Sequence, residues 1–137
     1  MIVKFYDQVE DEKLKFAVIA ARAEGKWVFC KHKARTTLEA PGGHREPGEP
    51  ILDTARRELQ EETGATAFDL QPVCVYSVTD PDNFDGAETY GLLCTAQVHA
   101  FGPIDSEMEK IVLTADLPTQ WTYPQIQPKL LAELERR

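Results

Sequence analysis

The 137-residue chain has no run approaching the roughly 18 apolar residues that a membrane span needs, and its first residues lack the apolar core of a signal peptide. Basic residues are scarce: 15 Lys and Arg stand against 23 Asp and Glu, a formal net charge of -8. Non-specific nucleic-acid binding needs clustered positive charge, so we expect no nucleic-acid polymer and no membrane as partner. A metal cation would have to lie between this chain and any polyanionic ligand.

Cysteine is also scarce, and the three present, Cys30, Cys74 and Cys94, form no CxxC pair. Each lies within an apolar segment, without a neighbour placed to activate its thiol. We therefore predict small buried side chains in a reducing compartment, and we expect a cytoplasmic protein.

The length is close to that of one average domain, which predicts a single domain over residues 1–137 and excludes a separate cofactor domain. Apolar periodicity and turn residues predict strands at 14–22, 26–33, 72–79, 90–101 and 110–114 and helices at 50–63 and 124–137. A Pro- and Gly-rich segment at 41–48 precedes the first helix. This order predicts an α/β or α+β domain.

Three carboxylates share one arc of the helix predicted at 50–63. Glu58, Glu61 and Glu62 are spaced i, i+3 and i+4, beside an apolar stripe that includes Leu59. Like charges at this spacing cost a helix about 0.2–0.5 kcal/mol, and partial burial raises that cost. A hard divalent cation such as Mg²⁺ would remove the repulsion. The alternative is an ordinary solvated face, on which Arg57 and Glu61 form an i,i+4 ion pair.

The segment before the helix favours the metal. Glu46 and Glu49 add two further acids, and Gly42, Gly43 and Gly48 permit a backbone path that side chains would block. Such a loop can offer carbonyl oxygens as additional ligands.

The segment from 43 to 65 resembles the Nudix box, which runs Gly, five residues, Glu, seven residues, Arg-Glu, an aliphatic residue, any residue, Glu-Glu, any residue, Gly and an aliphatic residue. The matching positions are Gly43, Glu49, Arg57, Glu58, Leu59, Glu61, Glu62 and Gly64. Ala65 departs from the usual Ile, Leu or Val at a position that packs rather than reacts. The resemblance implies a Nudix-type αβα sandwich, with a mixed β-sheet between helices, forming one Nudix hydrolase domain.

Members of this family use Mg²⁺ or Mn²⁺ to cut a nucleoside diphosphate linked to another group. The resemblance implies that Glu58, Glu61 and Glu62 bind the metal, together with the carbonyl of Gly43. It implies that Arg57 orients a catalytic carboxylate, and that Glu49 supports the metal site or shares the role of base. The base itself stays open between Glu58 and a later acid, for which Glu107 is the candidate; a solvated acid at a strand edge is the alternative there.

Substrate contacts are less constrained by the sequence. Lys31, Lys33 and Arg35 alternate, so we expect them to share one face, where they either hold phosphates or form an exposed basic surface. The aromatic residues available to stack on a base are Tyr76, Phe84, Tyr90, Trp121 and Tyr123. Phe84 is the first candidate, because it lies in a polar loop at 79–88.

The first functional interpretation is a compact MutT-like pyrophosphohydrolase of (deoxy)nucleoside triphosphates, acting as a monomer or homodimer. The alternative is an ADP-ribose or nucleotide-sugar pyrophosphatase, because Pro81, sixteen residues past the box, is a feature similar to ADP-ribose hydrolases. A non-catalytic nucleotide sensor is a third hypothesis, which the intact box disfavours.

Overall fold

The computed structural model describes residues 1–82 and 84–137, except for the side chain of Phe84. Its elements are β1 (Ile2–Tyr6), η1 (Asp11–Lys13), β2 (Leu14–Ala23), β3 (Lys26–His32), β4 (Gly42–His44), α1 (Ile51–Thr63), β5 (Ala65–Thr79), η2 (Phe84–Gly86), β6 (Glu88–Phe101), β7 (Met108–Thr114) and α2 (Gln127–Glu135). None of these helices is long and apolar enough to cross a membrane.

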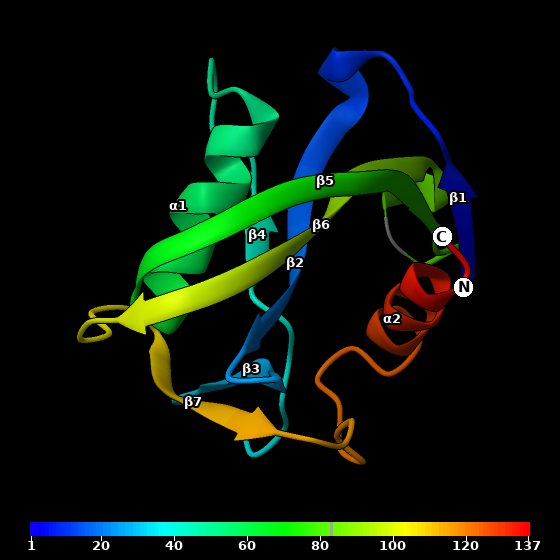
Figure 1. Cartoon of the computed structure of the whole chain (residues 1–137). Coiled ribbons are helices and arrows are strands. Elements are labelled where there is room, and N and C mark those ends of the chain that lie inside the picture. The colour runs from blue at the N-terminus through cyan, green and yellow to red at the C-terminus, as the bar shows by residue number, and fades with distance from the viewer. Residues whose placement is uncertain (83) are drawn as a thin grey trace.

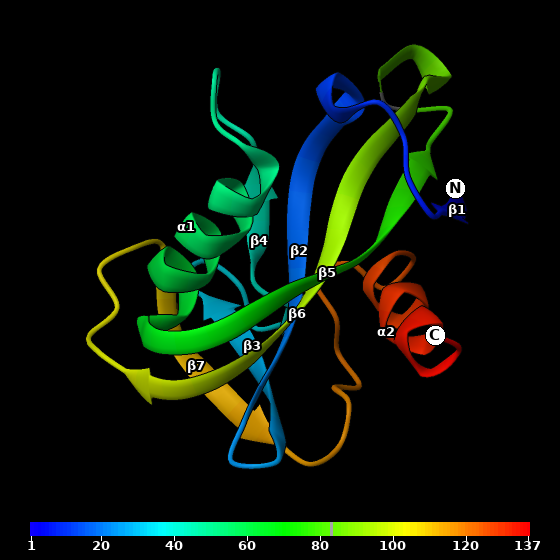
Figure 2. The same ribbon diagram turned by 45° about the horizontal axis from the view of Figure 1, so that its top comes forward.

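A mixed sheet forms the middle layer. Its strand order is β1-β5-β6-β2-β3-β7, and the short β4 pairs with β2. β2 and β6 run parallel, whereas the other pairs are antiparallel. Helices α1 and α2 lie on opposite sides of β2, β5 and β6 (Figure 1, Figure 2). The predicted αβα sandwich with a mixed sheet is therefore confirmed.

Each helix packs an apolar face on its own side of the sheet. Ala55 and Leu59 of α1 are fully buried against β2, β5 and β6, while Leu130 of α2 packs against Tyr76 and Leu93 on the other side. This burial of apolar area is the main source of stability for both helices.

Gly64 ends α1 and fixes the direction in which β5 leaves it. Its φ of 76° lies in the left-handed region, and its N–H donates to Gln60 O. A side chain at this position would clash with the carbonyl of Gly102, whose own N–H donates to Gly64 O at 2.6 Å. The end of α1 is thereby tied to the end of β6.

The predicted helix at 50–63 and the first two predicted strands are observed, whereas other boundaries differ. β5 begins at Ala65 rather than 72, because its first half pairs with the end of β6. Pro72 has no backbone N–H to donate, and it is tolerated inside the strand because it lies at a register shift. β1 and β4 were not predicted; each is short and is held by one partner strand. α2 begins at Gln127 rather than 124.

The three cysteines are free and buried, as predicted. Burial raises the pKa of each thiol, to about 12 for Cys94. These side chains therefore act as small apolar residues of the core.

Candidate active site

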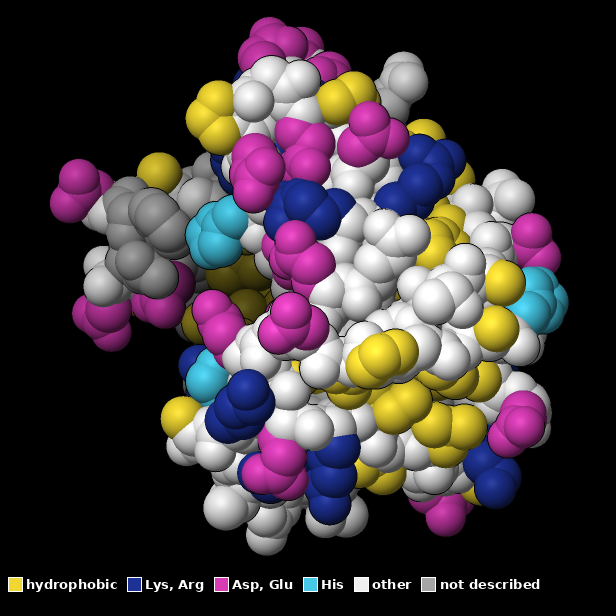
Figure 3. Space-filling model, turned by 90° about the vertical axis from the view of Figure 1, so that its left-hand side faces the viewer, with side chains coloured by type: hydrophobic (Ala, Val, Ile, Leu, Met, Phe, Trp, Pro, Cys, Tyr) yellow, Lys and Arg dark blue, Asp and Glu magenta, His cyan; other side chains and the backbone are white. Residues whose placement is uncertain are grey.

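A cleft of about 1010 Å³ runs from the carboxylates of α1, past β4, to the face of the sheet that carries α2. Glu58, Glu61 and Glu62 line one end, and Phe16 and Tyr76 line the other. Acidic side chains gather on the α1 side of the molecule (Figure 3). The structure thus brings the three predicted carboxylates to one end of a cleft large enough for a nucleotide.

Arg57 is bound to Glu49 by two parallel hydrogen bonds. Its Nε donates to Oε2 at 2.7 Å and its Nη2 to Oε1 at 2.9 Å, while the Thr54 hydroxyl donates to Oε1 at 2.6 Å. These donors lower the pKa of Glu49 to about 2, the bonds from Arg57 contributing most. Glu49 is therefore ionised and fully engaged, which suits a residue that orients Arg57 and not one that accepts a proton near neutral pH.

The same guanidinium also contacts carboxylates of the helix. Arg57 Nη1 lies 2.8 Å from Glu58 Oε1, 3.5 Å from Glu61 Oε2 and 3.8 Å from Glu46 Oε1. The i,i+4 contact with Glu61 expected from an ordinary helix face is present, but it is the longer and more exposed of the contacts with the two helix acids. Arg57 thus joins Glu49, which precedes α1, to Glu58 within the helix.

Glu58 and Glu62 are the more buried carboxylates. Burial raises the pKa of Glu58 in spite of its bond to Arg57. Burial also raises the pKa of Glu62 to about 8, and the like charges of Glu58, Glu39 and Glu107 raise it further. Only the backbone N–H of Gly42, which donates to Glu62 Oε1 at 2.8 Å, opposes the shift.

β4 places its two glycines differently. Gly43 lies opposite Ala17 of β2, and backbone hydrogen bonds join the strands on either side, at Pro41 and at Arg45. Because these bonds alternate along an antiparallel pair, the peptide groups of Gly43 turn toward β2 and those of Gly42 turn away from it.

The peptide groups of Gly42 face α1. Its N–H reaches Glu62 there, and His44, two residues on, accepts a hydrogen bond from Arg57 through its carbonyl at 2.9 Å. The carbonyl that faces the carboxylates is therefore that of Gly42, which corrects the expectation for Gly43. Gly43 instead supplies space, because a Cβ atom there would clash with the Glu58 carboxylate.

The donor set fits a hard divalent cation. Two half-buried carboxylates with raised pKa values lie together beside a backbone carbonyl, and a bound cation would offset their repulsion. Among the described residues, no three acidic, His or Cys side chains already stand at metal-binding geometry. Glu61, half exposed, and Glu107, 84% exposed, are the acids with room to turn inward.

Glu107 enters the cleft from the loop before β7. Its backbone carbonyl accepts from the Lys33 N–H at 3.0 Å, and its Oε2 lies 3.6 Å from His32 Nε2. His32 is itself oriented, because its Nδ1 accepts the Ala34 N–H at 3.0 Å. Both side chains line the cleft that holds Glu58 and Glu62.

Among the predicted basic residues, only Arg35 lines the cleft, where it is paired with the buried Glu39 at 3.0 Å. Lys31 pairs with Glu109 at 3.2 Å, and Lys33 follows the end of β3. β3 ends at His32, so the strand alternation from which one shared face was predicted does not extend to Lys33 and Arg35.

The aromatic candidates are divided among several sites. Tyr76 and Tyr123 line the cleft, Tyr90 bonds to Glu88, and Trp121 packs on Phe29. The side chain of Phe84 lies outside the described part of the structure. The sequence interpretation missed His32, Glu39 and Gln127 as cleft residues, because no local pattern distinguishes them.

Comparisons with known proteins show the family to which the chain belongs. The NUDIX domain family model matches residues 11–134. A Bacillus subtilis (strain 168) protein named "Putative 8-oxo-dGTP diphosphatase YtkD" is 37% identical over 76 residues, 56% of this chain and 48% of that protein. The "ADP-ribose pyrophosphatase" of the same organism is 44% identical over 64 residues, 44% of this chain and 35% of that protein. The chain thus spans half or less of the length of these relatives.

Solved structures share the fold. The Bacillus subtilis pyrophosphohydrolase BsRppH, in a mutant form, has a TM-score of 0.79 and 24% identity, with 98% of this chain and 90% of that chain covered. A MutT NUDIX hydrolase from Burkholderia pseudomallei has a TM-score of 0.63 and 22% identity, with 87% and 95% covered. On the family match over most of its length, this chain belongs to the NUDIX domain family.

Proposed function

We propose that this protein is a metal-dependent pyrophosphohydrolase, which cleaves the pyrophosphate linkage of a nucleoside diphosphate joined to another group. A (deoxy)nucleoside triphosphate, as for a MutT-type enzyme, is the proposed substrate. The observation that carries this proposal is the placement of Glu58 and Glu62 at the edge of β4, inside a nucleotide-sized cleft. The relative named as an 8-oxo-dGTP diphosphatase supports it.

Glu58, Glu61 and Glu62 would hold Mg²⁺ or Mn²⁺ together with the Gly42 carbonyl. When bound, such an ion screens the phosphate oxygens and lowers the pKa of the attacking water. The protein's own part is to keep these carboxylates charged and in place. Because the pKa of Glu62 is about 8, it must lose a proton before it can act as a ligand.

Arg57 and Glu49 act as positioning residues in this proposal. Glu49 holds the guanidinium through two hydrogen bonds, and the guanidinium holds Glu58. The base that takes the proton of the water is Glu58 or Glu107. Arg35, at the rim of the cleft, is the proposed contact for a substrate phosphate.

An ADP-ribose or nucleotide-sugar pyrophosphatase is the second candidate. The relative named "ADP-ribose pyrophosphatase" favours it, with higher identity over a shorter segment. The carboxylate end of the cleft suits both reactions, because each cuts a diphosphate bridge. The candidates therefore differ only in what occupies the rest of the cleft.

A substrate panel with Mg²⁺ tests the proposal. Release of pyrophosphate or orthophosphate from triphosphates supports the first candidate, and release of AMP from ADP-ribose supports the second. Tight binding without turnover of any substrate would instead indicate a sensor. We propose that the protein acts in the cytoplasm, supported by its three free, buried cysteines, and as a monomer or homodimer.

A further inference from the structure

His32 is a cleft residue to which the proposed chemistry assigns no role. It is the last residue of β3, and its partly buried side chain lines the cleft. Glu107, from the loop before β7, lines the same part of the cleft, and its charge contributes to the raised pKa of Glu62. The contact between His32 and Glu107 therefore lies near the carboxylates of α1.

A register shift between β3 and β7 brings the two side chains together. Lys31 lies opposite Lys110, whereas His32 lies opposite Met108, so β7 has one residue more than β3 across this step. Such a bulge changes the direction of the side chains beside it, and bulges are frequent next to active sites. Here it places His32 next to Glu107, the residue before Met108.

The imidazole ring of His32 is held in one tautomer. Its Nδ1 accepts the Ala34 backbone N–H at 3.0 Å. Because a backbone N–H can only donate, Nδ1 carries no hydrogen in this arrangement, and the hydrogen of the neutral ring is on Nε2. The lone pair of Nδ1 is thus occupied and Nε2 is protonated, so neither nitrogen is free to bind a metal ion or to take a proton. The ring acts toward the cleft as a hydrogen-bond donor.

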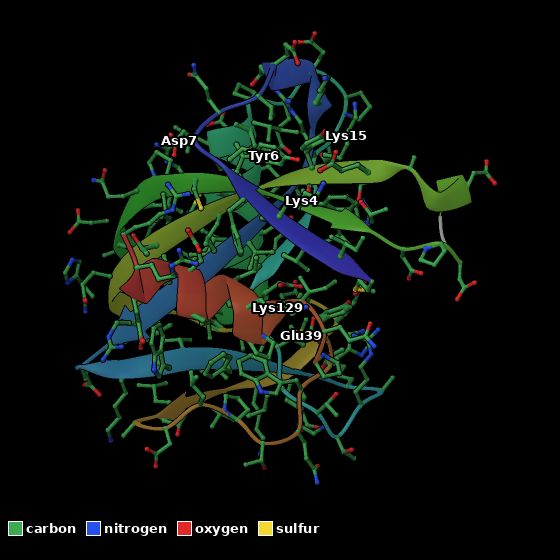
Figure 4. The ribbon with its side chains drawn as sticks, turned by 90° about the vertical axis from the view of Figure 1, so that its right-hand side faces the viewer. Lys4, Tyr6, Asp7, Lys15, Glu39 and Lys129 are labelled. Atoms are coloured by element: carbon green, nitrogen blue, oxygen red, sulfur yellow. The ribbon has the colours of Figure 1, made fainter. Side chains whose placement is uncertain are left out.

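The turn after β3 fixes this donor relative to the cleft. The carbonyl of His32 accepts the Arg35 N–H at 3.1 Å, and the backbones of Cys30 and Glu39 close the loop with two hydrogen bonds of 2.8 and 3.0 Å. The segment that carries Glu39 passes beside the first turn of α2, which carries Lys129 (Figure 4). The loop is therefore anchored on both β3 and α2.

The side chain of Glu107 is much less constrained. Its backbone carbonyl is held by the Lys33 N–H at 3.0 Å, but the side chain is 84% exposed. Its Oε2 lies 3.6 Å from His32 Nε2, just beyond the length of a hydrogen bond. Hydrogen bonds of catalytic groups are often long without substrate and shorten when it binds. A rotation of this exposed carboxylate closes the remaining gap.

We propose that His32 is a positioning residue for Glu107: its Nε2–H binds the Glu107 carboxylate and holds it at the carboxylate end of the cleft. Without this donor, the exposed side chain would sample several rotamers, and only some of them would face the cleft. The inference rests on the proposed function only in that Glu107 takes part in hydrolysis.

Two substitutions separate this role from a structural role in the turn. His32→Asn keeps a side-chain oxygen for the Ala34 N–H, as in an Asx turn, but is too short to reach Glu107. His32→Gln places an amide N–H near the position of Nε2 and gives up the turn contact. With the nucleotide that the substrate panel shows to be hydrolysed, we expect His32→Asn to lower kcat about tenfold with little change in KM. His32→Gln should retain most of the kcat. An unchanged kcat in His32→Asn, or a larger loss in His32→Gln, overturns the inference.

A double-mutant cycle shows whether His32 acts through Glu107. In the Glu107→Ala background, His32→Asn should have no further effect on kcat. His99→Asn is the matched control, because the exposed His99 also contacts a carboxylate, that of Asp69 at 2.8 Å, outside the cleft lining. This control should keep the wild-type kcat. Losses that multiply in the double variant contradict the proposal.

The nitrogen chemical shifts of the His32 ring test the contact without turnover. They are measured by NMR in metal-free buffer, at a pH at which the ring is neutral. The shifts should place the hydrogen on Nε2, and Glu107→Ala should move the Nε2 resonance, whereas Asp69→Ala should not. A hydrogen on Nδ1, or an Nε2 resonance that does not respond to Glu107→Ala, overturns the inference.

These measurements separate the inference from the proposed function. If the wild-type protein hydrolyses no nucleotide while the Nε2 resonance depends on Glu107, the contact stands and the hydrolase proposal fails. If the protein hydrolyses nucleotides and Glu107→Ala keeps the wild-type kcat, the hydrolase proposal stands and the positioning role of His32 fails.

Discussion

Arg57 Nε lies 2.7 Å from Glu49 Oε2, and this contact is one of two parallel hydrogen bonds that join Glu49, two residues before α1, to the middle of that helix. The fork geometry is specific to arginine and a carboxylate. It holds the guanidinium where its remaining nitrogen reaches Glu58. Glu49 therefore acts on the reaction through Arg57.

Replacing Glu49 by Gln should lower kcat by about 10- to 100-fold with a smaller change in KM, because Arg57 loses its anchor while the metal ligands remain. Asp53→Asn makes the same carboxylate-to-amide change on the exposed side of α1, where Asp53 pairs with Arg56, and should leave kcat unchanged. Steady-state kinetics on both variants measure this. Equal losses in the two variants would show that Glu49 has no special role.

Glu61→Gln should reduce turnover by orders of magnitude while leaving the melting temperature in metal-free buffer equal or higher, because one of several like charges is removed. The wild-type protein should be inactive in EDTA and recover with Mg²⁺ or Mn²⁺. Full activity in the chelator would reject the metal site, and a misfolded variant with unchanged specific activity would contradict the role of Glu61.

The raised pKa of Glu62 predicts an unusual pH dependence of the free energy of unfolding in the absence of metal. Its pKa is about 8 in the folded protein, against an ordinary value of 4.5. The folded state therefore binds the Glu62 proton more tightly than the unfolded state does. The contribution of this proton to the free energy of unfolding is complete below the ordinary pKa and is lost as the pH rises through 8. The loss is no more than about 1.4 kcal/mol per pH unit.

Denaturant unfolding in EDTA from pH 5 to pH 9 should show this decline, and Glu62→Gln should flatten it. Magnesium binding requires the ionised form, so added Mg²⁺ should stabilise the wild-type protein more at pH 8 than at pH 6. A metal-free stability that rises across this range would contradict the assignment.

Gly43→Ala should inactivate the enzyme without unfolding it, because the new Cβ would displace the Glu58 carboxylate. The double variant Gly43→Ala/Glu58→Ala removes the clashing group and should melt at a higher temperature than Gly43→Ala alone. Thermal melts of the two proteins check this. A double variant that is less stable would indicate that the clash lies with the backbone and not with Glu58.

The base can be assigned by comparing Glu58→Gln with Glu107→Gln. The acid limb of the pH profile of kcat/KM reports the base in the free enzyme. It should disappear in the variant that lacks the base and persist in the other, which should show a uniform loss instead. If both variants keep the limb, neither residue is the base.

The family, the α1 helix and its arc of carboxylates could all be predicted from the amino-acid sequence, because they depend on spacing within one continuous segment. A box with fixed intervals and a helical period needs no knowledge of distant residues. Local patterns also predicted the end of this helix at residue 63 and the burial of the cysteines.

Features that depend on contacts between distant segments became visible only in the folded chain. The strand pairing of β4 turned the Gly42 carbonyl toward α1 and placed Gly43 against the Glu58 carboxylate. Lys31, within β3, pairs with Glu109, and Lys33 follows the end of β3, and neither lines the cleft. Gln127 became a cleft residue only because its amide meets a backbone N–H far away in the sequence. Direction, burial and partner are properties of the assembled sheet and helices, and no local pattern of residues encodes them.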